Sequence, residues 1–318
     1  IWIAHEGINT TGGQGGIEKI NVNTLAVQHF GPGINARGFT VYSEGEGLPT
    51  RRVQQIVVDP YNKVWAAHRY HDVTSSPDYI VTPGSICSRM ADASGPFENY
   101  STWNDWQNRT TTGIMLERLP YPAYTYNPPV SVSPDSRTVN AISVDSSFIY
   151  ISVYGYNDSN GVFNSSGNVV PTTYLKPRII KYTNEAVPQY VREYTTQDAR
   201  FLSQNGIFNG VYANDKGVWV TTPIAGNGFS VLKNGVWKNI TDSSILPPGT
   251  SFNKSAIWGD SDGRVYLGTN KGLIVYDGVS DIFSHNAYTL FSKTFYDSYR
   301  CVHDPDMLSN IIIAGCVE

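Results

Sequence analysis

Histidines and acidic residues lie close together at two places in the sequence. Glu6 follows His5, and His71 and Asp72 come shortly after His68. Imidazole nitrogens and carboxylate oxygens bind Zn²⁺ and other divalent ions, so these side chains could converge on a metal. In a straight strand, however, residues three apart such as His68 and His71 point to opposite faces. We therefore predict polar residues at strand ends rather than a metal site, and we expect no cofactor.

Aspartates that could serve as catalytic acids recur at one position of a repeated motif. Each ends a short apolar strand and precedes a tight turn, at positions 59, 145, 215, 260 and 304. Aspartate suits such turns because its side chain hydrogen-bonds the nearby backbone. Five copies at one structural position indicate turn caps, and no Ser-His-Asp or Cys-His arrangement can be assembled from the sequence. We therefore predict no catalytic residue.

Two strand motifs alternate along the chain and must position these side chains. Strand A ends in the recurring aspartate, at 53–59, 139–145, 209–215, 255–260 and 300–304. Strand B begins with a β-branched residue and usually an aromatic, at 1–5, 64–68, 149–153, 218–222, 265–269 and 311–315. A strand C is predicted at 15–21, 177–183, 228–234 and 272–278, and a strand D at 39–44, 190–195, 236–241 and 282–286. Units of four short strands with an aromatic at a fixed place are typical of β-propeller blades, where the aromatics fill the space between blades.

The repeat predicts an all-β fold, a β-propeller of four-stranded antiparallel blades forming one domain over residues 1–318. Five blades are recognisable and five to seven are expected. A long insertion in the second blade, about 69–135, lacks periodicity and is predicted to be an ordered surface excursion. Strand A at 300–304 could join the N-terminal strands and close a five-bladed ring, leaving 311–315 without a place. Otherwise the chain is part of a longer protein with a larger ring, or a neighbouring chain pairs with the free strand edge.

Two stretches of the repeat resemble a known family. The sequences GEGLPTRRVQQIVVDPYNKVWAAH (45–68) and SAIWGDSDGRVYLGTNKGLIVYDG (255–278) are similar to the two-component regulator propeller repeat. The resemblance implies a propeller from the extracytoplasmic sensor half of a signalling receptor or from a secreted bacterial surface protein. The chain departs from the sensor type because it shows neither a kinase sequence nor a membrane-spanning run. The resemblance therefore bears on the fold more than on the function.

Composition and charge exclude several classes of protein. Hydrophobic residues make up 40% of the chain and charged residues 16%, which fits a folded protein rather than a disordered one. The net charge of −4 gives no electrostatic attraction to nucleic acid or to an anionic membrane. No apolar run reaches the roughly 18 residues of a membrane span. We expect neither nucleic-acid binding nor membrane insertion.

Sequons and cysteines bear on the compartment. Asn-x-Ser/Thr sequons, the glycosylation candidates, occur at Asn9, Asn99, Asn108, Asn157, Asn164, Asn239 and Asn253. They predict an extracellular or cell-surface protein if they are used, and bacterial secretion, including a periplasmic location, remains open if they are not. Three cysteines are too few for a disulfide framework. Cys301 and Cys316 lie on strands expected to pair diagonally, and a disulfide between them is one alternative.

These observations predict an exported propeller that binds or builds rather than catalyses. The ligand face, for a protein or glycan partner, is predicted at the 69–135 insertion and the loops 6–16 and 154–176, which are rich in Tyr, Asn and Ser. Assembly through unpaired terminal strands and the sensing of a glycan or peptide are alternatives within this class. The rival class is an enzyme, a polysaccharide lyase or glycosidase working at the mouth of the channel.

Overall fold

The computed structural model describes the strands of five larger sheets and the turns between many of them. The described residues are 1–5, 16–30, 33–34, 40–41, 48, 53–68, 71–73, 80–82, 85–93, 97–100, 103–104, 111–112, 139–153, 162–163, 169–170, 178–195, 208, 210–222 and 228–292. Within them, one short 3-10 helix, His285–Ala287, accompanies the strands. No helix in this part of the chain is long and apolar enough to cross a membrane.

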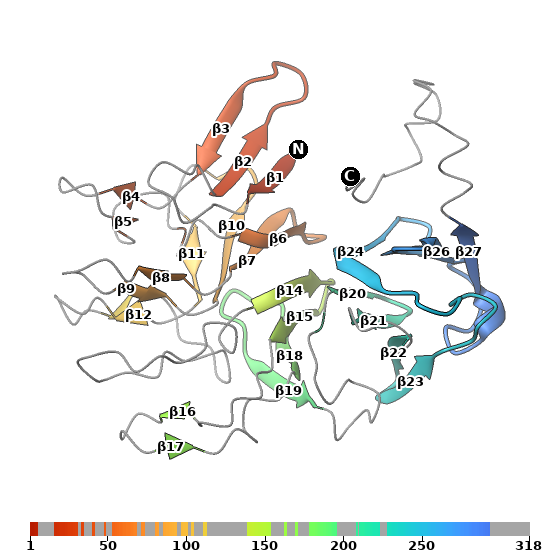
Figure 1. Cartoon of the computed structure of the whole chain (residues 1–318). Helices are drawn as coiled ribbons and strands as arrows, with labels where there is room; N and C mark the ends of the chain where they lie inside the picture. Colours follow the sequence, from red (N-terminus) through yellow and green to blue (C-terminus); the bar gives the residue numbers. More distant parts are fainter. Residues whose placement is uncertain are drawn as a thin grey trace.

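Four of the sheets have four antiparallel strands in chain order from one edge to the other (Figure 1). The second sheet contains β6 (Val53–Val58), β7 (Lys63–His68), β10 (Ser85–Met90) and β11 (Glu98–Asn99). The third contains β14 (Val139–Val144), β15 (Phe148–Val153), β18 (Arg178–Thr183) and β19 (Tyr190–Tyr194). The fourth contains β20 (Gly210–Asn214), β21 (Gly217–Thr221), β22 (Phe229–Lys233) and β23 (Val236–Ile240). The fifth contains β24 (Phe252–Gly259), β25 (Val265–Thr269), β26 (Gly272–Tyr276) and β27 (Tyr288–Ser292).

The first sheet has three strands, β1 (Trp2–His5), β2 (Gly16–Ile20) and β3 (Val27–Phe30). Its first strand carries the motif of the second strand of every other sheet, a β-branched residue followed by an aromatic. In the described residues, the place of a first strand at the inner edge of β1 is therefore empty. Four two-stranded ladders complete the strands: β4 (Gly33–Ile34) with β5 (Thr40–Val41), β8 (His71–Val73) with β9 (Ile80–Thr82), β12 (Trp103–Asn104) with β13 (Thr111–Thr112), and β16 (Val162–Phe163) with β17 (Val169–Val170).

The five sheets follow one another around a common centre (Figure 1). Their inner strands contact in chain order, β1 against β6, β6 against β14, β14 against β20 and β20 against β24. One cluster of buried side chains fills each space between neighbouring sheets. This is an all-β, propeller-like arrangement, and it confirms the repeat of four-stranded antiparallel units predicted from the sequence.

The aromatic of the second strand packs between sheets, as predicted. Trp65 lies among side chains of the third sheet, Tyr150 among those of the fourth and Trp219 among those of the fifth. Both tryptophans are fully buried. Each such side chain removes about 150–250 Å² of mostly apolar surface from water, so these positions hold neighbouring sheets together.

The structure corrects two of the predicted strands. In the first sheet, the strand at the fourth position of the repeat is β3 and not the predicted 39–44. Residues 40–41 of that range pair with residues 33–34 in a separate ladder. In the fifth sheet the fourth strand is β27, because residues 282–286 enter a turn and the 3-10 helix. Both wrongly predicted segments are short and mix apolar with polar residues, so the alternation of residue types was not enough to identify the strand.

The range 69–135 is not one uninterrupted insertion. The third and fourth strands of the second sheet, β10 and β11, lie inside it. The sequence SICSRM was missed because Ile86 and Cys87 are adjacent and both fully buried, which breaks the alternation typical of a strand with one wet face. The repeat at 300–304 and 311–315 lies outside the described residues, as do both cysteines assigned to a disulfide, Cys301 and Cys316.

Candidate functional site

A cavity of about 860 Å³ lies where the inner strands of all five sheets converge. Its wall is mostly apolar and includes Ile1, Trp2, Val58, Val144, Val211, Ile257 and Trp258. Its rim is formed by the turns that follow the first strands, among them residues 59–60, 145–146 and 214–215. The repeat therefore builds one shared concavity from equivalent positions of several sheets.

Two kinds of connecting turn lie at the end where this cavity is rimmed. Antiparallel pairing puts the turn between first and second strands beside the turn between third and fourth strands, as the partners Lys63 and Met90 show. The turns of the first kind are 59–63, 145–147, 214–217 and 260–264, and the described residues of the second kind are 21–26, 91–93, 97, 184–189, 234–235 and 277–287. We call this end of the molecule the turn face.

Trp258 is the aromatic side chain best placed to meet a ligand in the cavity. It is 40% exposed although it belongs to an inner strand, and its ring stacks on Tyr266 with centroids 5.9 Å apart. The neighbouring Gly259 allows Tyr212 to lie against the backbone, because a Cβ there would be 2.2 Å from the Tyr212 hydroxyl. An exposed indole held flat by a second ring is a surface on which an apolar side chain or a sugar ring can stack.

The aspartates of the repeat cap turns, as predicted. Asp59 is buried, and its Oδ1 accepts hydrogen bonds from the backbone N–H groups of Tyr61 and Lys63, both at 2.9 Å. Its Oδ2 accepts from Trp65 Nε1 at 3.0 Å and from Asn184 Nδ2 at 3.3 Å. The carboxylate thus ties its own turn to the interior of the sheet and to the next sheet.

The fourth sheet departs from the predicted pattern. By strand register, Asn214 occupies the place of Asp59, since the residue before it, Ala213, pairs with Val218 as Val58 pairs with Val64. Asn214 Oδ1 accepts the backbone N–H of Lys216 at 2.9 Å. Asp215 instead points to solvent and forms an ion pair with Lys216 at 3.1 Å. The turn cap is therefore Asn214 and not Asp215.

A cleft of about 490 Å³ separates the second and third sheets at the turn face and contains a group of polar side chains. Lys63 Nζ lies 4.3 Å from the centre of the Trp65 ring and donates to the Tyr100 hydroxyl at 3.2 Å. That hydroxyl donates to Glu98 Oε2 at 2.7 Å and accepts from Ser88 Oγ at 3.1 Å. Burial lowers the pKa of Lys63 and raises the pKa of Tyr100. Sequence reasoning missed this group because its members come from three strands with no shared motif.

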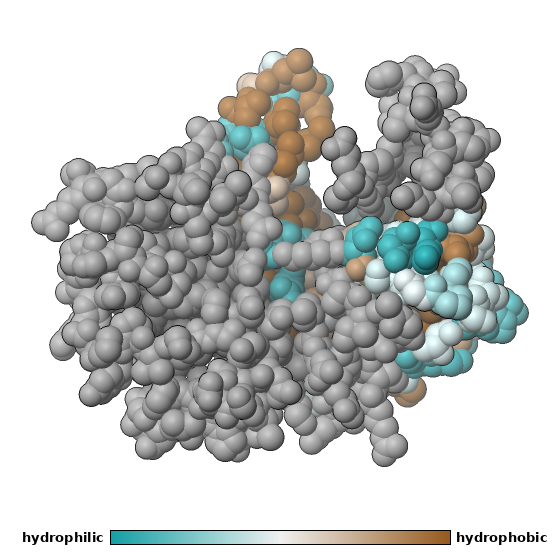
Figure 2. All heavy atoms as spheres, viewed as in Figure 1, coloured by the Kyte–Doolittle hydropathy of each residue, from teal (hydrophilic) through white to brown (hydrophobic). Residues whose placement is uncertain are grey.

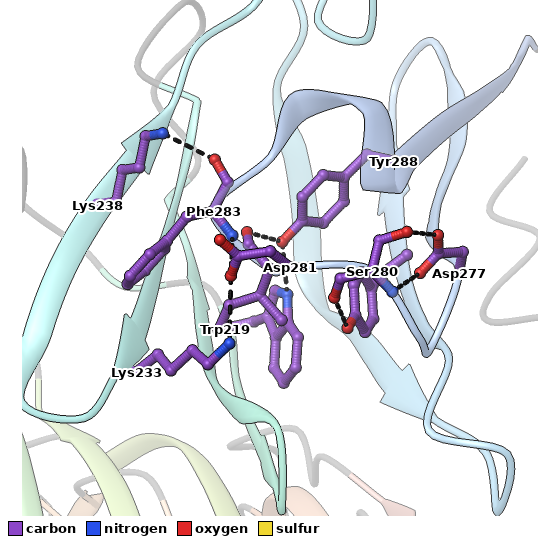
Figure 3. A network of polar contacts seen from close by, with 10 residues as sticks. Trp219, Lys233, Lys238, Asp277, Ser280, Asp281, Phe283 and Tyr288 are labelled. Carbon is purple, nitrogen blue, oxygen red and sulfur yellow. Dashed lines mark hydrogen bonds and ion pairs between the residues drawn. The ribbon is translucent and has the colours of Figure 1, made fainter.

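A second cleft, of about 350 Å³, lies between the fourth and fifth sheets. Figure 3 shows how the segment after β26 spans it: Lys233 Nζ contacts Asp281 Oδ1 at 3.2 Å, and Lys238 Nζ donates to the Phe283 carbonyl at 2.8 Å. Deeper in the interface, Trp219 Nε1 donates to the Tyr288 hydroxyl at 3.1 Å, which donates to the Ile282 carbonyl at 2.8 Å. The hydrogen bond from Lys233 and that from the Phe283 amide hold the pKa of Asp281 below its usual range. This network fixes the two sheets to each other.

The histidines singled out in the sequence do not form a metal site in the described part of the chain. No group of three His, Cys, Asp or Glu side chains converges among those residues. His68 is fully buried at the end of β7, and its Nε2 lies 3.2 Å from Cys87 Sγ. Burial raises the pKa of the Cys87 thiol. His68 is thus a fully buried residue with a polar partner at the end of its strand.

The other predicted site residues are only partly described. Asn253 is exposed near the start of β24, Asn239 is half-buried in β23, and Asn99 lies in β11. Asn9, Asn108, Asn157 and Asn164 lie outside the described residues, and so do loops 6–15, 154–161 and most of 101–138. The described strands fix where the predicted ligand loops begin: His5, His68 and Val153 each end a second strand, at the end of the sheet opposite the turn face.

Comparisons with known proteins return remote structural similarity alone. No family model matches the sequence, and no curated protein matches it. The extracellular domain of a putative one-component system from B. thetaiotaomicron is 13% identical with a TM-score of 0.44, covering 83% of this chain and 25% of that one. YCF48 from Cyanidioschyzon merolae is 11% identical with a TM-score of 0.40, covering 82% of this chain and 63% of that one. A Trypanosoma rangeli sialidase mutant is 13% identical with a TM-score of 0.34, covering 78% of this chain and 38% of that one. These similarities establish no family membership.

Proposed function

We propose that this protein is a non-catalytic binding module of the propeller type, acting outside the cytoplasm at the cell surface or in secreted form. The observation that carries the proposal is the central cavity of about 860 Å³, to which all five sheets contribute and in which Trp258 is exposed. Concave, mostly apolar sites with a few polar groups at the rim are where proteins bind ligands. The sequons and the resemblance to extracytoplasmic sensor propellers support the location.

The ligand of such a module is a protein segment or a glycan, because both offer a flat or apolar group to Trp258 and polar groups to the turn rim. The loops 6–16, 69–135 and 154–176 remain a second proposed ligand surface. The role is sensing if the module belongs to a receptor and scaffolding if it belongs to a surface assembly. Self-assembly through the inner edge of β1 is the alternative to completion of the first sheet by the chain itself, since an unpaired edge accepts a further strand.

Ring completion is the structural part of the proposal. We infer that the repeat segment 300–304 supplies the first strand that β1 lacks, because it has the apolar run and terminal aspartate of the other first strands.

The test of the function is a binding screen on the purified protein with Trp258→Ala as the informative variant. Wild-type protein is applied to a peptide array and to a glycan array, and each hit is titrated by calorimetry. The proposal expects at least one ligand class whose affinity falls about tenfold or more in Trp258→Ala, as loss of a stacking aromatic costs on the order of 1 kcal/mol or more. Val191→Ala, an exposed position on outer strand β19, is the control and should leave affinity unchanged. If every ligand binds the Trp258→Ala variant as tightly as the wild type, the proposed site in the cavity is contradicted.

An enzyme remains the rival function, and one observation favours it. Lys63, Tyr100, Glu98 and Ser88 form a hydrogen-bonded group in an open cleft, and burial lowers the pKa of Lys63. A lyase or glycosidase at this cleft would turn over an acidic or neutral polysaccharide. Release of new sugar ends that is lost in Lys63→Met and in Tyr100→Phe would overturn the non-catalytic proposal.

A further inference from the structure

Exposed apolar side chains gather on the turn face. Of the 13 large hydrophobic side chains that are exposed in the described residues, all but Val191 and Phe291 lie there. Five are in the turns themselves, Val22, Leu25, Tyr61, Val187 and Val279, and the rest are at strand ends that enter or leave these turns. Isolated exposed apolar residues are normal in proteins, but their concentration on one face marks an interaction surface.

The β2–β3 hairpin shows the pattern most clearly. It projects from the first sheet, and Figure 2 shows hydrophobic atoms over its surface. Leu25 at its tip is 75% exposed and has a φ of 57°, a left-handed conformation that a leucine adopts at a conformational cost. The turn is held in this shape by Asn21, whose Oδ1 accepts the backbone N–H groups of Asn23 and Thr24. The hairpin thus presents an apolar side chain to solvent at a rigid position.

The turn face carries an excess of negative charge. Its turns contain nine carboxylates and three basic side chains, Lys63, Lys216 and Arg264. Glu98 borders them, and the head groups of four more basic residues contact the same turns, namely those of Lys19, Arg89, Lys233 and Lys238. The face therefore has ten carboxylates and seven basic groups. Asp215 and Asp262 are about 70% exposed, and each is ion-paired with a basic neighbour in its own turn.

The concavities of the turn face adjoin one another. The cleft between the second and third sheets shares the lining residue Asp59 with the central cavity, and the cleft between the fourth and fifth sheets shares Asp215 with it. Three adjacent hollows on one face suit an extended chain better than a small compact molecule.

We propose that the turn face docks a polypeptide segment rich in basic and apolar residues, which lies across the face with an apolar side chain in the central cavity. The proposal rests on the binding function proposed above and names its partner. Charge complementarity selects a basic segment, since the carboxylates of the turn face outnumber its basic groups by ten to seven. The same charge repels nucleic acid and anionic lipid surfaces. It also opposes pairing of two turn faces from two copies of the chain.

The test measures the affinity of three acetylated, amidated eight-residue peptides by calorimetry. The probe is (Lys-Leu)4, and its matched controls are (Glu-Leu)4, with reversed charge, and (Lys-Ser)4, without apolar side chains. We expect (Lys-Leu)4 to bind at least about tenfold more tightly than either control at 20 mM NaCl. Its advantage over (Glu-Leu)4 should shrink at 300 mM NaCl, because the screening length falls from about 20 Å to about 6 Å.

Two sets of variants locate the site. The triple variant Asp215→Asn, Glu185→Gln, Asp262→Asn removes three negative charges from the turn face and should weaken (Lys-Leu)4 binding at least about tenfold at 20 mM NaCl. The control Thr241→Lys, Asn253→Lys, Ser292→Lys changes net charge equally at exposed positions at the opposite strand ends and should weaken it far less. Leu25→Asn together with Val279→Ser removes two apolar contacts, and asparagine tolerates the left-handed conformation at position 25.

The outcomes separate this proposal from the binding function itself. Equal affinity for (Lys-Leu)4 and (Glu-Leu)4, with both lost in Trp258→Ala, overturns the basic partner and leaves the cavity as a binding site. Glycan binding that depends on Trp258, with no peptide bound, also overturns the basic partner and leaves the cavity as a binding site. Equal effects of the two charge-changing triple variants would overturn a site on the turn face. Salt-sensitive self-association abolished by the turn-face variant would identify a second copy of the chain as the occupant and also overturn the proposal.

Discussion

At the scale of single residues, turn caps of the same type differ widely in what they hold together. Asp59 accepts four hydrogen bonds, one of them from the buried Trp65 indole and one from Asn184 of the third sheet. Asp260 accepts two backbone N–H groups and the Tyr266 hydroxyl, all within its own sheet. The cost of losing a carboxylate therefore depends on how many of its donors are buried, because a buried donor without a partner loses its hydration as well.

Asp59→Ala should lower the free energy of unfolding by about 2 to 4 kcal/mol, since it leaves the Trp65 indole N–H and two turn amides without their acceptor. Asp215→Ala is the matched control, because Asp215 is exposed and contacts the flexible Lys216, and it should change stability by less than about 0.5 kcal/mol. Urea unfolding followed by tryptophan fluorescence measures both. Equal losses for the two variants would contradict the assignment of Asp59 as an inter-sheet cap.

At the scale of elements, neighbouring sheets are joined both by apolar clusters and by polar groups buried among them. The fourth and fifth sheets meet through the segment 277–287, which brings Ile282 and Tyr288 against Trp219. A Cβ at Gly217 would lie 2.6 Å from Ile282 Cδ1, so the close approach of this segment depends on glycine in β21. The connection of one sheet thus serves as packing for the previous one.

Tyr288→Phe should destabilise the protein by about 1 to 3 kcal/mol, because it leaves the buried Trp219 N–H and the Ile282 carbonyl without their partner. Tyr61→Phe removes a hydroxyl that donates to the Ser146 carbonyl at an exposed position, and should cost less than about 0.5 kcal/mol. The two tyrosines lose the same atom, so thermal unfolding of both variants isolates the effect of burial. A larger loss for Tyr61→Phe would be incompatible with this account.

At the scale of the whole molecule, the repeat motif was sufficient to predict the four-stranded units, their turns and their inter-sheet aromatics. It worked because Val64-Trp65 and Val218-Trp219 carry both the strand propensity and the large side chain that the interface needs. It failed where local pattern and tertiary position disagree. β10 is buried on both faces and lacks alternation, and Asn214 replaces aspartate without changing the turn.

The candidate site was less predictable than the fold. The cavity is formed by residues from five separate sheets, and only the ring arrangement brings Trp2 and Trp258 to the same cavity. Trp258 carried a usable signal, since the other first strands have Val57, Ser143 and Tyr212 at its position. The Lys63 group had no signal in the sequence. Its members become neighbours only through strand pairing and through the approach of the third sheet.

If residues 300–304 complete the first sheet, the other sheets predict which of these residues pairs with which residue of β1. In the second, third and fifth sheets the residue before the aspartate pairs with the β-branched residue of the second strand, as Val58 pairs with Val64. Applied to 300–304, this register pairs Cys301 with Ile3. The equivalent pair, Ile56 and Ala66, is not a hydrogen-bonded one, and such pairs have Cα atoms about 4.5 Å apart, within the range of a disulfide.

Ile3→Cys in a Cys316→Ser background should therefore form an intramolecular disulfide with Cys301 on mild oxidation, detected by mass spectrometry of a non-reduced digest. Ala4→Cys in the same background faces the other side of the strand and should form far less. A disulfide between two copies would mean that a neighbouring chain fills the edge, and no disulfide would contradict completion by 300–304. In the unsubstituted protein, the same digest shows whether Cys301 pairs with Cys316.

The central claim is that the turn face, around the cavity, is a ligand-binding surface. Hydrogen–deuterium exchange with and without the (Lys-Leu)4 peptide tests it most directly. We predict slower exchange on binding for the amides of residues 57–63, 143–147 and 257–264, which surround the cavity. Protection confined to 66–68, 85–87 and 151–153, at the opposite strand ends, would contradict the claim.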